Sequence, residues 1–361
     1  MKLNHPIVFL IFLIPVLVLS GCAGGVTAAS SWPGLTVDEL TAYLAYNNHV
    51  YAIQIESGTQ LWRYPQERDA RTTFYADPVL SPDGQLILGG YNNVLYSLNP
   101  ESGTVNWEFN SAENRYVAPP LVNEQGIFAP AADEKLYALT LSGESRWEFS
   151  TQGEAWAQPT AGNECECLYL PTLDHRIYAV DLDNGDELWR SEDFGGAIVG
   201  KPALSEDGAL YVGSFASEIL ALDTQGGSVL WRAPTEDWVW SGPTLAGDRL
   251  YVGDLEGYFY ALNATSGEEI WKLAPGQLDG KIVGSPLVIE NDIYVVTESG
   301  NLYNLDDSGK IKWTKTVGGK LYTTPRLAGD LILVAPIQID AVLVAYTREG
   351  AKEWEFIPPE E

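Results

Sequence analysis

A glycine followed four residues later by a tryptophan occurs eight times along the chain, and this repeat constrains the fold more than any other feature. The pairs are Gly58/Trp62, Gly103/Trp107, Gly143/Trp147, Gly185/Trp189, Gly227/Trp231, Gly267/Trp271, Gly309/Trp313 and Gly350/Trp354. Successive tryptophans lie 45, 40, 42, 42, 40, 42 and 41 residues apart. Such a period belongs either to propeller blades or to helical repeats.

The pattern inside each repeat distinguishes the two. In residues 243–271, the apolar runs Leu-Tyr-Val and Tyr-Phe-Tyr-Ala-Leu are separated by the turn residues Gly-Asp, Glu-Gly and Ser-Gly. Short alternating runs rich in aromatic and β-branched residues are typical of strands. A single small sheet cannot bury both faces, whereas copies closed into a ring leave only short, protected edges. We therefore predict an all-β fold, an eight-bladed β-propeller of four-stranded antiparallel blades, over residues 32–361.

The repeat is in phase along this whole region. The first copy begins at Trp32-Pro33, and a proline also opens the seven later copies: Pro78, Pro120, Pro159, Pro202, Pro243, Pro286 and Pro325. The last copy ends at Phe356. The sequence leaves open whether the two ends of the chain share one blade.

The N-terminal residues form an export signal. Lys2 gives a positive start, and residues 7–19 form an apolar stretch that is too short to span a bilayer as a helix. The sequence Leu-Ser-Gly-Cys at 19–22 resembles the lipobox of bacterial lipoproteins, which implies acylation of Cys22. We predict a lipoprotein signal peptide over 1–21, then the acylated cysteine and a flexible tether over 22–31. The alternative is an ordinary signal peptide with an incidental cysteine.

The net charge limits the partners. It is −28, and removing the signal peptide also removes Lys2, which leaves −29. Such a chain repels nucleic-acid phosphates and anionic lipid head groups, so we expect no nucleic acid as partner and membrane contact through the lipid anchor only. The acidity is interpreted as a soluble surface, with a face for a basic partner as the alternative.

The recurring Tyr-Ala-Leu-Asp…Gly-x-x-x-Trp pattern, seen as Tyr-Ala-Val-Asp at 178–181 and as Tyr-Ala-Leu-Asn at 260–263, resembles the pyrroloquinoline quinone (PQQ) repeat of quinoprotein-type β-propellers. The resemblance covers residues 32–356 and implies that each tryptophan packs between neighbouring blades, against a small residue of the third strand. Seven copies have a small residue at that position: Ala52, Ser97, Ala138, Ala179, Ala221, Ala261 and Ala345. Asn304 is the exception, so we expect the seventh junction to pack differently. The tryptophans are interpreted as structural.

Few residues suggest catalysis. His49 and His175 are isolated in separate repeats, so we predict no catalytic residue and no metal site. Enzymes of the resembling family hold PQQ and calcium in a pocket built by insertions, whereas only 63–77 and 272–285 exceed the usual linker here. We therefore expect no cofactor, with PQQ and calcium as the less favoured alternative. Cys165 and Cys167 are predicted to form a disulfide in an oxidising envelope, or to remain two free thiols because so tight a ring is strained.

One position varies in a way that packing alone does not require. The residues three positions before the blade-opening prolines are Tyr75, Val117, Trp156, Val199, Trp240, Val283 and Tyr322. In a propeller this position lies at the entrance of the central channel. Because valine suffices in three copies, the aromatic residues Tyr75, Trp156, Trp240 and Tyr322 are a candidate binding rim. Packing between blades is the alternative interpretation. Trp238, Arg68, Arg71, Arg115 and Lys201 lie in the same linkers.

The order of lipid anchor, short tether and eight blades without insertions resembles the BamB-type lipoproteins of outer-membrane protein assembly. This resemblance implies a non-catalytic scaffold that binds envelope or outer-membrane proteins. The predicted location is the cell envelope: the periplasmic side of the outer membrane in a Gram-negative host, otherwise the cell surface. Two alternatives remain, a PQQ-dependent oxidoreductase and a surface module that binds a small ligand or glycan at the central funnel.

Overall fold

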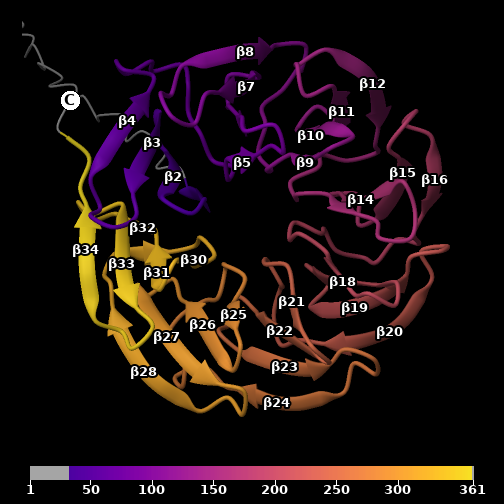
Figure 1. Cartoon of the computed structure of the whole chain (residues 1–361). Helices are drawn as coiled ribbons and strands as arrows, with labels where there is room; N and C mark the ends of the chain where they lie inside the picture. The colour runs from indigo at the N-terminus through magenta and orange to yellow at the C-terminus, as the bar shows by residue number, and fades with distance from the viewer. Residues whose placement is uncertain (1–31, 360–361) are drawn as a thin grey trace, which may run out of the picture. The chain divides into compact units, whose positions relative to one another are not determined.

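The computed structural model describes residues 32–359, which form one ring of antiparallel sheets (Figure 1). Eight four-stranded sheets follow one another along the chain, so the predicted eight-bladed β-propeller is confirmed. No helix occurs in residues 32–359, and hence none there is long and apolar enough to cross a membrane. The predicted signal peptide, Cys22 and the tether lie outside the described residues.

The first four blades have the following strands. Blade 1 contains β1 (Gly34–Val37), β2 (Thr41–Tyr46), β3 (His49–Gln54) and β4 (Gln60–Tyr64). Blade 2 contains β5 (Val79–Leu80), β6 (Leu86–Gly89), β7 (Leu95–Leu98) and β8 (Val105–Phe109). Blade 3 contains β9 (Leu121–Asn123), β10 (Gly126–Ala131), β11 (Lys135–Leu139) and β12 (Ser145–Ser150). Blade 4 contains β13 (Thr160–Ala161), β14 (Cys167–Pro171), β15 (Ile177–Asp181) and β16 (Glu187–Arg190).

The other four blades repeat this order. Blade 5 contains β17 (Ala203–Leu204), β18 (Ala209–Ser214), β19 (Glu218–Asp223) and β20 (Val229–Pro234). Blade 6 contains β21 (Thr244–Ala246), β22 (Arg249–Gly253), β23 (Phe259–Asn263) and β24 (Glu269–Leu273). Blade 7 contains β25 (Leu287–Ile289), β26 (Asp292–Val296), β27 (Asn301–Asp306) and β28 (Ile311–Thr316). Blade 8 contains β30 (Arg326–Ala328), β31 (Leu331–Val334), β33 (Leu343–Thr347) and β34 (Lys352–Phe356), with β29 (Lys320–Leu321) and β32 (Pro336–Ile337) as an added pair.

Each repeated tryptophan joins two blades. Its residue pairs across the sheet with the small residue of the third strand, as Ala52 pairs with Trp62. Its indole Nε1 donates to a backbone carbonyl of the next blade at all eight junctions, over 2.8–3.2 Å. The seventh junction follows the same scheme, because Trp313 pairs with Asn304 and donates to Arg348 O. The expectation of different packing there was wrong: Asn304 is buried, and its Nδ2 donates to Asp292 Oδ1 over 3.0 Å.

Two features of the structure require a glycine at this position of the repeat. All eight have φ between +68° and +85°, a region that side chains with a Cβ disfavour. Each glycine also lies on the indole of the preceding blade, where an added Cβ would come within 2.5–3.1 Å of the ring. The spacing of glycine and tryptophan therefore couples the turn of one blade to the packing of its neighbour.

The core is divided among the junctions. Eight clusters of buried apolar residues lie between successive blades, and one of them joins β1–β3 of blade 1 to β31 and β33 of blade 8. The third and fourth strands of each blade lie toward the outside of the ring (Figure 1). Burial is thus shared evenly around the ring, and no blade has a core of its own.

The two ends of the chain do not share a blade, which settles a point that the sequence left open. Blade 1 consists of β1–β4 alone, and blade 8 ends with β34. Arg326 of β30 closes the ring: its Nε donates to Leu35 O over 2.9 Å, and its Nη2 lies 2.6 Å from Asp77 Oδ2. Asp77 Oδ1 accepts from Leu35 N over 2.9 Å. Leu35 of the first strand is therefore held from both sides.

We expect Arg326→Met to weaken this closure. The variant leaves Asp77 unpaired and Leu35 O without its donor, and because the ion pair is partly exposed, the loss in unfolding free energy should be about 1–2 kcal/mol. Arg71→Met is the matched control, since Arg71 pairs with Asp69 on an exposed surface and its loss should leave the unfolding free energy nearly unchanged. Urea unfolding followed by circular dichroism measures both. Equal effects for the two variants would contradict this account of the closure.

Candidate functional site

Two adjacent positions before each blade-opening proline have opposite environments. The residues four positions before the proline are at most 1% exposed: Phe74, Tyr116, Ala155, Ile198, Val239, Ile282 and Leu321. They fill the space between blades, as shown by Gly89, where an added Cβ would come within 2.2 Å of Tyr116 Cβ. Because side chains alternate along an extended chain, the residues three positions before the proline point the other way. The residues four positions before the proline are therefore the ones that pack between blades.

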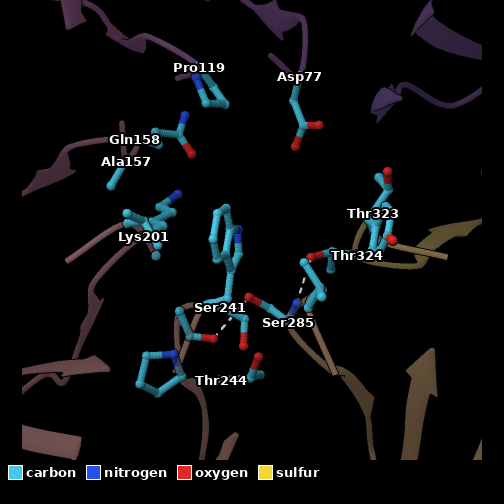
Figure 2. Close-up of a pocket in the computed structure, with 18 of the residues that line it drawn as sticks. Asp77, Pro119, Ala157, Gln158, Lys201, Ser241, Thr244, Ser285, Thr323 and Thr324 are labelled. Carbon is cyan, nitrogen blue, oxygen red and sulfur yellow. Dashed lines mark hydrogen bonds between the residues drawn. The ribbon is translucent and has the colours of Figure 1, made fainter. Parts of the chain in front are cut away.

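The residues three positions before the proline all line one central cavity of about 630 Å³. They are Tyr75, Val117, Trp156, Val199, Trp240, Val283 and Tyr322. The structure thus brings the four aromatic residues of the candidate rim together with the three valines, at the place expected from the sequence. Whether this rim binds a ligand stays a prediction. Figure 2 shows part of the cavity lining, with Asp77, Gln158, Lys201, Ser285 and Thr324 around one space.

Trp32 also lines the cavity, and the sequence analysis did not identify it. It precedes Pro33 directly, whereas the rim residues stand three positions before their prolines. Its ring centroid lies 5.2 Å from that of Trp240 and 4.9 Å from that of Tyr322. The sequence does contain Trp32 directly before the first blade-opening proline. It was missed because it does not stand three positions before the proline, as the rim residues do.

Polar contacts orient the rim aromatics. Trp156 Nε1 donates to Glu154 over 2.6 Å, and the hydroxyl of Tyr322 donates to Glu298 over 2.9 Å. The hydrogen bond from Lys320 to Glu298 holds the pKa of this carboxyl below its usual range, even though burial opposes the shift. Tyr75 lies against Tyr91 with 4.0 Å between ring centroids. The rim is therefore a set of fixed aromatic faces.

The chain of aromatic contacts continues outside the cavity. Phe215 contacts Trp240, with 5.3 Å between centroids, and stacks on Trp238 at 4.9 Å. Trp238 is half exposed, so the stack reaches the surface from the channel mouth. Of the linker arginines, Arg115 lies over Tyr91, and Arg71 pairs with Asp69 instead of entering the cavity.

The cavity wall has three charged residues: Asp77, Lys201 and Arg326. Asp77 and Arg326 pair with each other at the ring closure. Lys201 is accessible to water inside the cavity, although protein atoms surround much of it, and it makes no ion pair or side-chain hydrogen bond with any described residue. Burial lowers the pKa of Lys201; the nearby Arg326 adds to the shift and Asp77 opposes it. Because Asp77 and Arg326 pair with each other, the charge of Lys201 is left to face the cavity.

The lining residues do not fit PQQ with calcium. Calcium takes six to eight oxygen ligands, commonly from several carboxylates. Asp77 is the only carboxylate among the described lining residues, and both of its oxygens are already bonded. Within residues 32–359 no group of three or more metal-ligating side chains occurs. We therefore derive no chemistry through this cofactor.

The remaining candidates lie apart from the cavity. His49 Nδ1 is bonded to Pro65 O, and His175 forms an exposed pair with Asp193. The sulfur atoms of Cys165 and Cys167 are bonded to each other in blade 4. Gly162 makes room for this disulfide, because an added Cβ there would come within 2.5 Å of Cys165 Sγ. None of these four residues lines the central cavity.

A second surface of interest is an apolar arc on the outside of three consecutive blades, formed by Leu188, Leu230 and Ile270. Each stands directly before the repeated tryptophan, on β16, β20 and β24, and they are 50%, 56% and 43% exposed. Figure 1 shows these strands at the outer edge of the ring. In four other blades the same position is polar: Asn106, Arg146, Lys312 and Glu353. Blade 1 has Leu61 there, on the opposite side of the ring.

Charged pairs flank the apolar arc. Arg232 of β20 pairs with Glu192 and Glu218 at 2.7 and 2.6 Å. Lys272 of β24 pairs with Glu236 at 3.1 Å. An apolar centre with a polar surround is the usual anatomy of a protein–protein interface. The fold does not require aliphatic residues at this position, since four blades are built without them.

Comparison with known proteins gives a consistent result. The family model described as "Outer membrane protein assembly factor BamB" matches residues 46–170, 173–286 and 255–360. The protein of that name from Burkholderia pseudomallei is 27% identical over 115 residues, 32% of this chain and 29% of the relative. The one from Escherichia coli is 30% identical over 91 residues, 23% of each chain. The matched segments thus span less than a third of these relatives.

Two solved structures have a similar fold. The crystal structure of BamB from Moraxella catarrhalis superposes with a TM-score of 0.71 at 19% identity, covering 84% of this chain and 92% of that one. The computationally designed Ika8 protein superposes with a TM-score of 0.73 at 14% identity, covering 91% and 96%. At these identities the likeness concerns the fold alone.

Proposed function

The chain belongs to the family of outer membrane protein assembly factor BamB, and from this membership we propose that it is a non-catalytic scaffold for proteins of outer-membrane assembly. The apolar arc is the observation in the structure that supports this proposal most. Leu188, Leu230 and Ile270 expose aliphatic side chains in three adjacent blades, whereas four of the other five blades are polar at this position. Exposed apolar patches with a polar rim mark interaction surfaces. The proposed occupant is a protein with an apolar surface of its own.

The proposal includes a lipid anchor at Cys22. Nine residues, 23–31, lie between this cysteine and Trp32, the first described residue. An extended chain of that length reaches at most about 35 Å, so the anchored ring would remain close to the membrane surface. Cys22→Ser should release the protein from the membrane fraction into the soluble envelope fraction. Retention of this variant in the membrane fraction would contradict anchoring by lipid.

The scaffold proposal is tested by recovery of partners. We would tag the full chain at its C-terminus in its own host, crosslink mildly and purify it in detergent. The expected result is recovery of integral outer-membrane proteins or their assembly factors. Failure to recover any of them would contradict the proposal. A PQQ-dependent oxidoreductase is not proposed, because the cavity lining does not fit the cofactor.

A further inference from the structure

We propose that the central cavity is a binding site for an organic carboxylate with a flat or apolar body. The proposal goes beyond the scaffold function and is independent of it, because the apolar arc and the cavity are made from different residues. It rests on one cation without a counter-ion and on the aromatic walls beside it.

The cation is the ammonium of Lys201. It faces the same space as Gln158 and Asp77 (Figure 2). Asp77 and Arg326, the other two charged groups among the described lining residues, pair with each other. The fold does not need a lysine there: the residue directly before the blade-opening proline is Gln158 in blade 4, Ser285 in blade 7 and Thr324 in blade 8. A cation held in the cavity without a counter-ion is suited to an anion.

The hydroxyl of Ser241, on the neighbouring blade, does not add a second group for the ligand. Ser241 is 4% exposed, and its Oγ has no hydrogen-bond partner among the described residues but also no surface open to the cavity. It stands two positions before the proline, so the alternation of side chains directs it between the blades, like the residue two positions earlier.

Lys201 and Ser241 belong to neighbouring blades that touch at this point. An added Cβ on Gly200 would lie 2.4 Å from the Ser241 carbonyl carbon, and one on Gly242 would lie 2.0 Å from Lys201 O. The backbone that carries Lys201 is therefore in direct contact with the neighbouring blade. Its ammonium would bind the carboxylate of the ligand.

The aromatic walls of the cavity determine what the ligand carries besides its carboxylate. Trp240 stands directly before Ser241, and Trp32 lies between Trp240 and Tyr322 at the same cavity. Aromatic faces favour flat or apolar groups over chains of hydroxyls without apolar faces. The carboxylate chemistry fits either a free organic acid or the C-terminus of a peptide, and the experiment separates these sources.

The test measures two matched pairs of probes on the purified full chain in detergent, by isothermal titration calorimetry. Phenylacetate is compared with phenylacetamide, and the peptide Gly-Gly-Phe with its C-terminal amide. Each acid should bind about tenfold more tightly than its amide, because only the acid makes the charged hydrogen bond. Preference in the first pair alone indicates a free acid as ligand, and preference in both pairs indicates that chain ends also fit.

Variants that copy the equivalent residues of other blades show which side chains cause the preference for the acid. Lys201→Gln, which copies Gln158, should abolish the preference for the acid. Trp240→Val, which copies Val199 and Val283, should weaken acid and amide alike. Lys310→Met, which removes an exposed lysine from a turn of blade 7, should change nothing. Near-ultraviolet circular dichroism checks that each variant is folded.

The pH dependence gives a further readout. Lys201 loses its charge as the pH rises through its lowered pKa, so the affinity for phenylacetate should fall there and that for phenylacetamide should not. In Lys201→Gln neither affinity should change. The proposal is overturned if no probe binds at 10 mM (about the weakest affinity of interest), if acids and amides bind equally, or if the preference survives in Lys201→Gln.

Discussion

Replacing Trp62 with alanine should lower the free energy of unfolding by about 3–5 kcal/mol, the range for removing a buried tryptophan. Trp62 is 6% exposed, lies on Gly103 of the next blade and donates to Pro100 O over 2.8 Å. The variant leaves a cavity between blades 1 and 2 and a carbonyl without its donor. Urea unfolding followed by far-ultraviolet circular dichroism measures the loss without relying on tryptophan fluorescence.

Two further variants separate the parts of this contact. Trp62→Phe keeps most of the ring but loses the hydrogen bond and should cost about 1–2 kcal/mol. Gly103→Ala places a Cβ 2.5 Å from the indole at a φ of +70°, so it should also destabilise. In the double variant with Trp62→Ala, the steric cost of Gly103→Ala should disappear because the indole is absent. The two losses of unfolding free energy should therefore not be additive. Additive effects, or a small cost for Trp62→Ala, would contradict the account of the blade junctions.

The triple variant Leu188→Asn, Leu230→Asn and Ile270→Asn should abolish recovery of the protein partner while leaving the ring folded. Asparagine is the residue that blade 2 has at this position, as Asn106, so the strand tolerates it. The three aliphatic side chains are about half exposed, so their replacement should change the unfolding free energy by less than about 1 kcal/mol. Loss of an apolar interface centre costs a partner far more, commonly about 2 kcal/mol or more per anchor residue.

Leu61→Asn is the matched control for this variant. Leu61 is as exposed as Leu230 and precedes the same tryptophan, but it stands in blade 1, opposite blade 5. It should leave partner recovery unchanged. Recovery by the triple variant equal to that of the unaltered chain would show that the apolar arc is not the interface.

Most of the fold could be predicted from the sequence because its determinants are local and repeated eight times. Period-two strands, turn glycines and the phase of Gly-x-x-x-Trp each recur often enough to identify the blades. The rim position could be found for a related reason: comparison of the copies shows where Trp156 and Val199 replace one another. Repetition thus separates what the fold needs from what varies.

The features that sequence reasoning missed are those without a repeat. Trp32 enters the cavity from outside the rim position, and Arg326 reaches from β30 to both Leu35 and Asp77. Both depend on how the first and last blades meet, which no period encodes. Asn304 was misjudged because its partner, Asp292, lies on the adjacent strand twelve residues earlier. A polar residue at a packed position is tolerated when such a partner is present.

The central claim is that this propeller binds a protein partner through the apolar arc. The most direct measurement places a photo-crosslinking amino acid at position 230 or at position 61 of the full chain in growing cells. The account predicts an adduct with an outer-membrane assembly protein from position 230 and none from position 61. No adduct from position 230, or the same adduct from both positions, would contradict it.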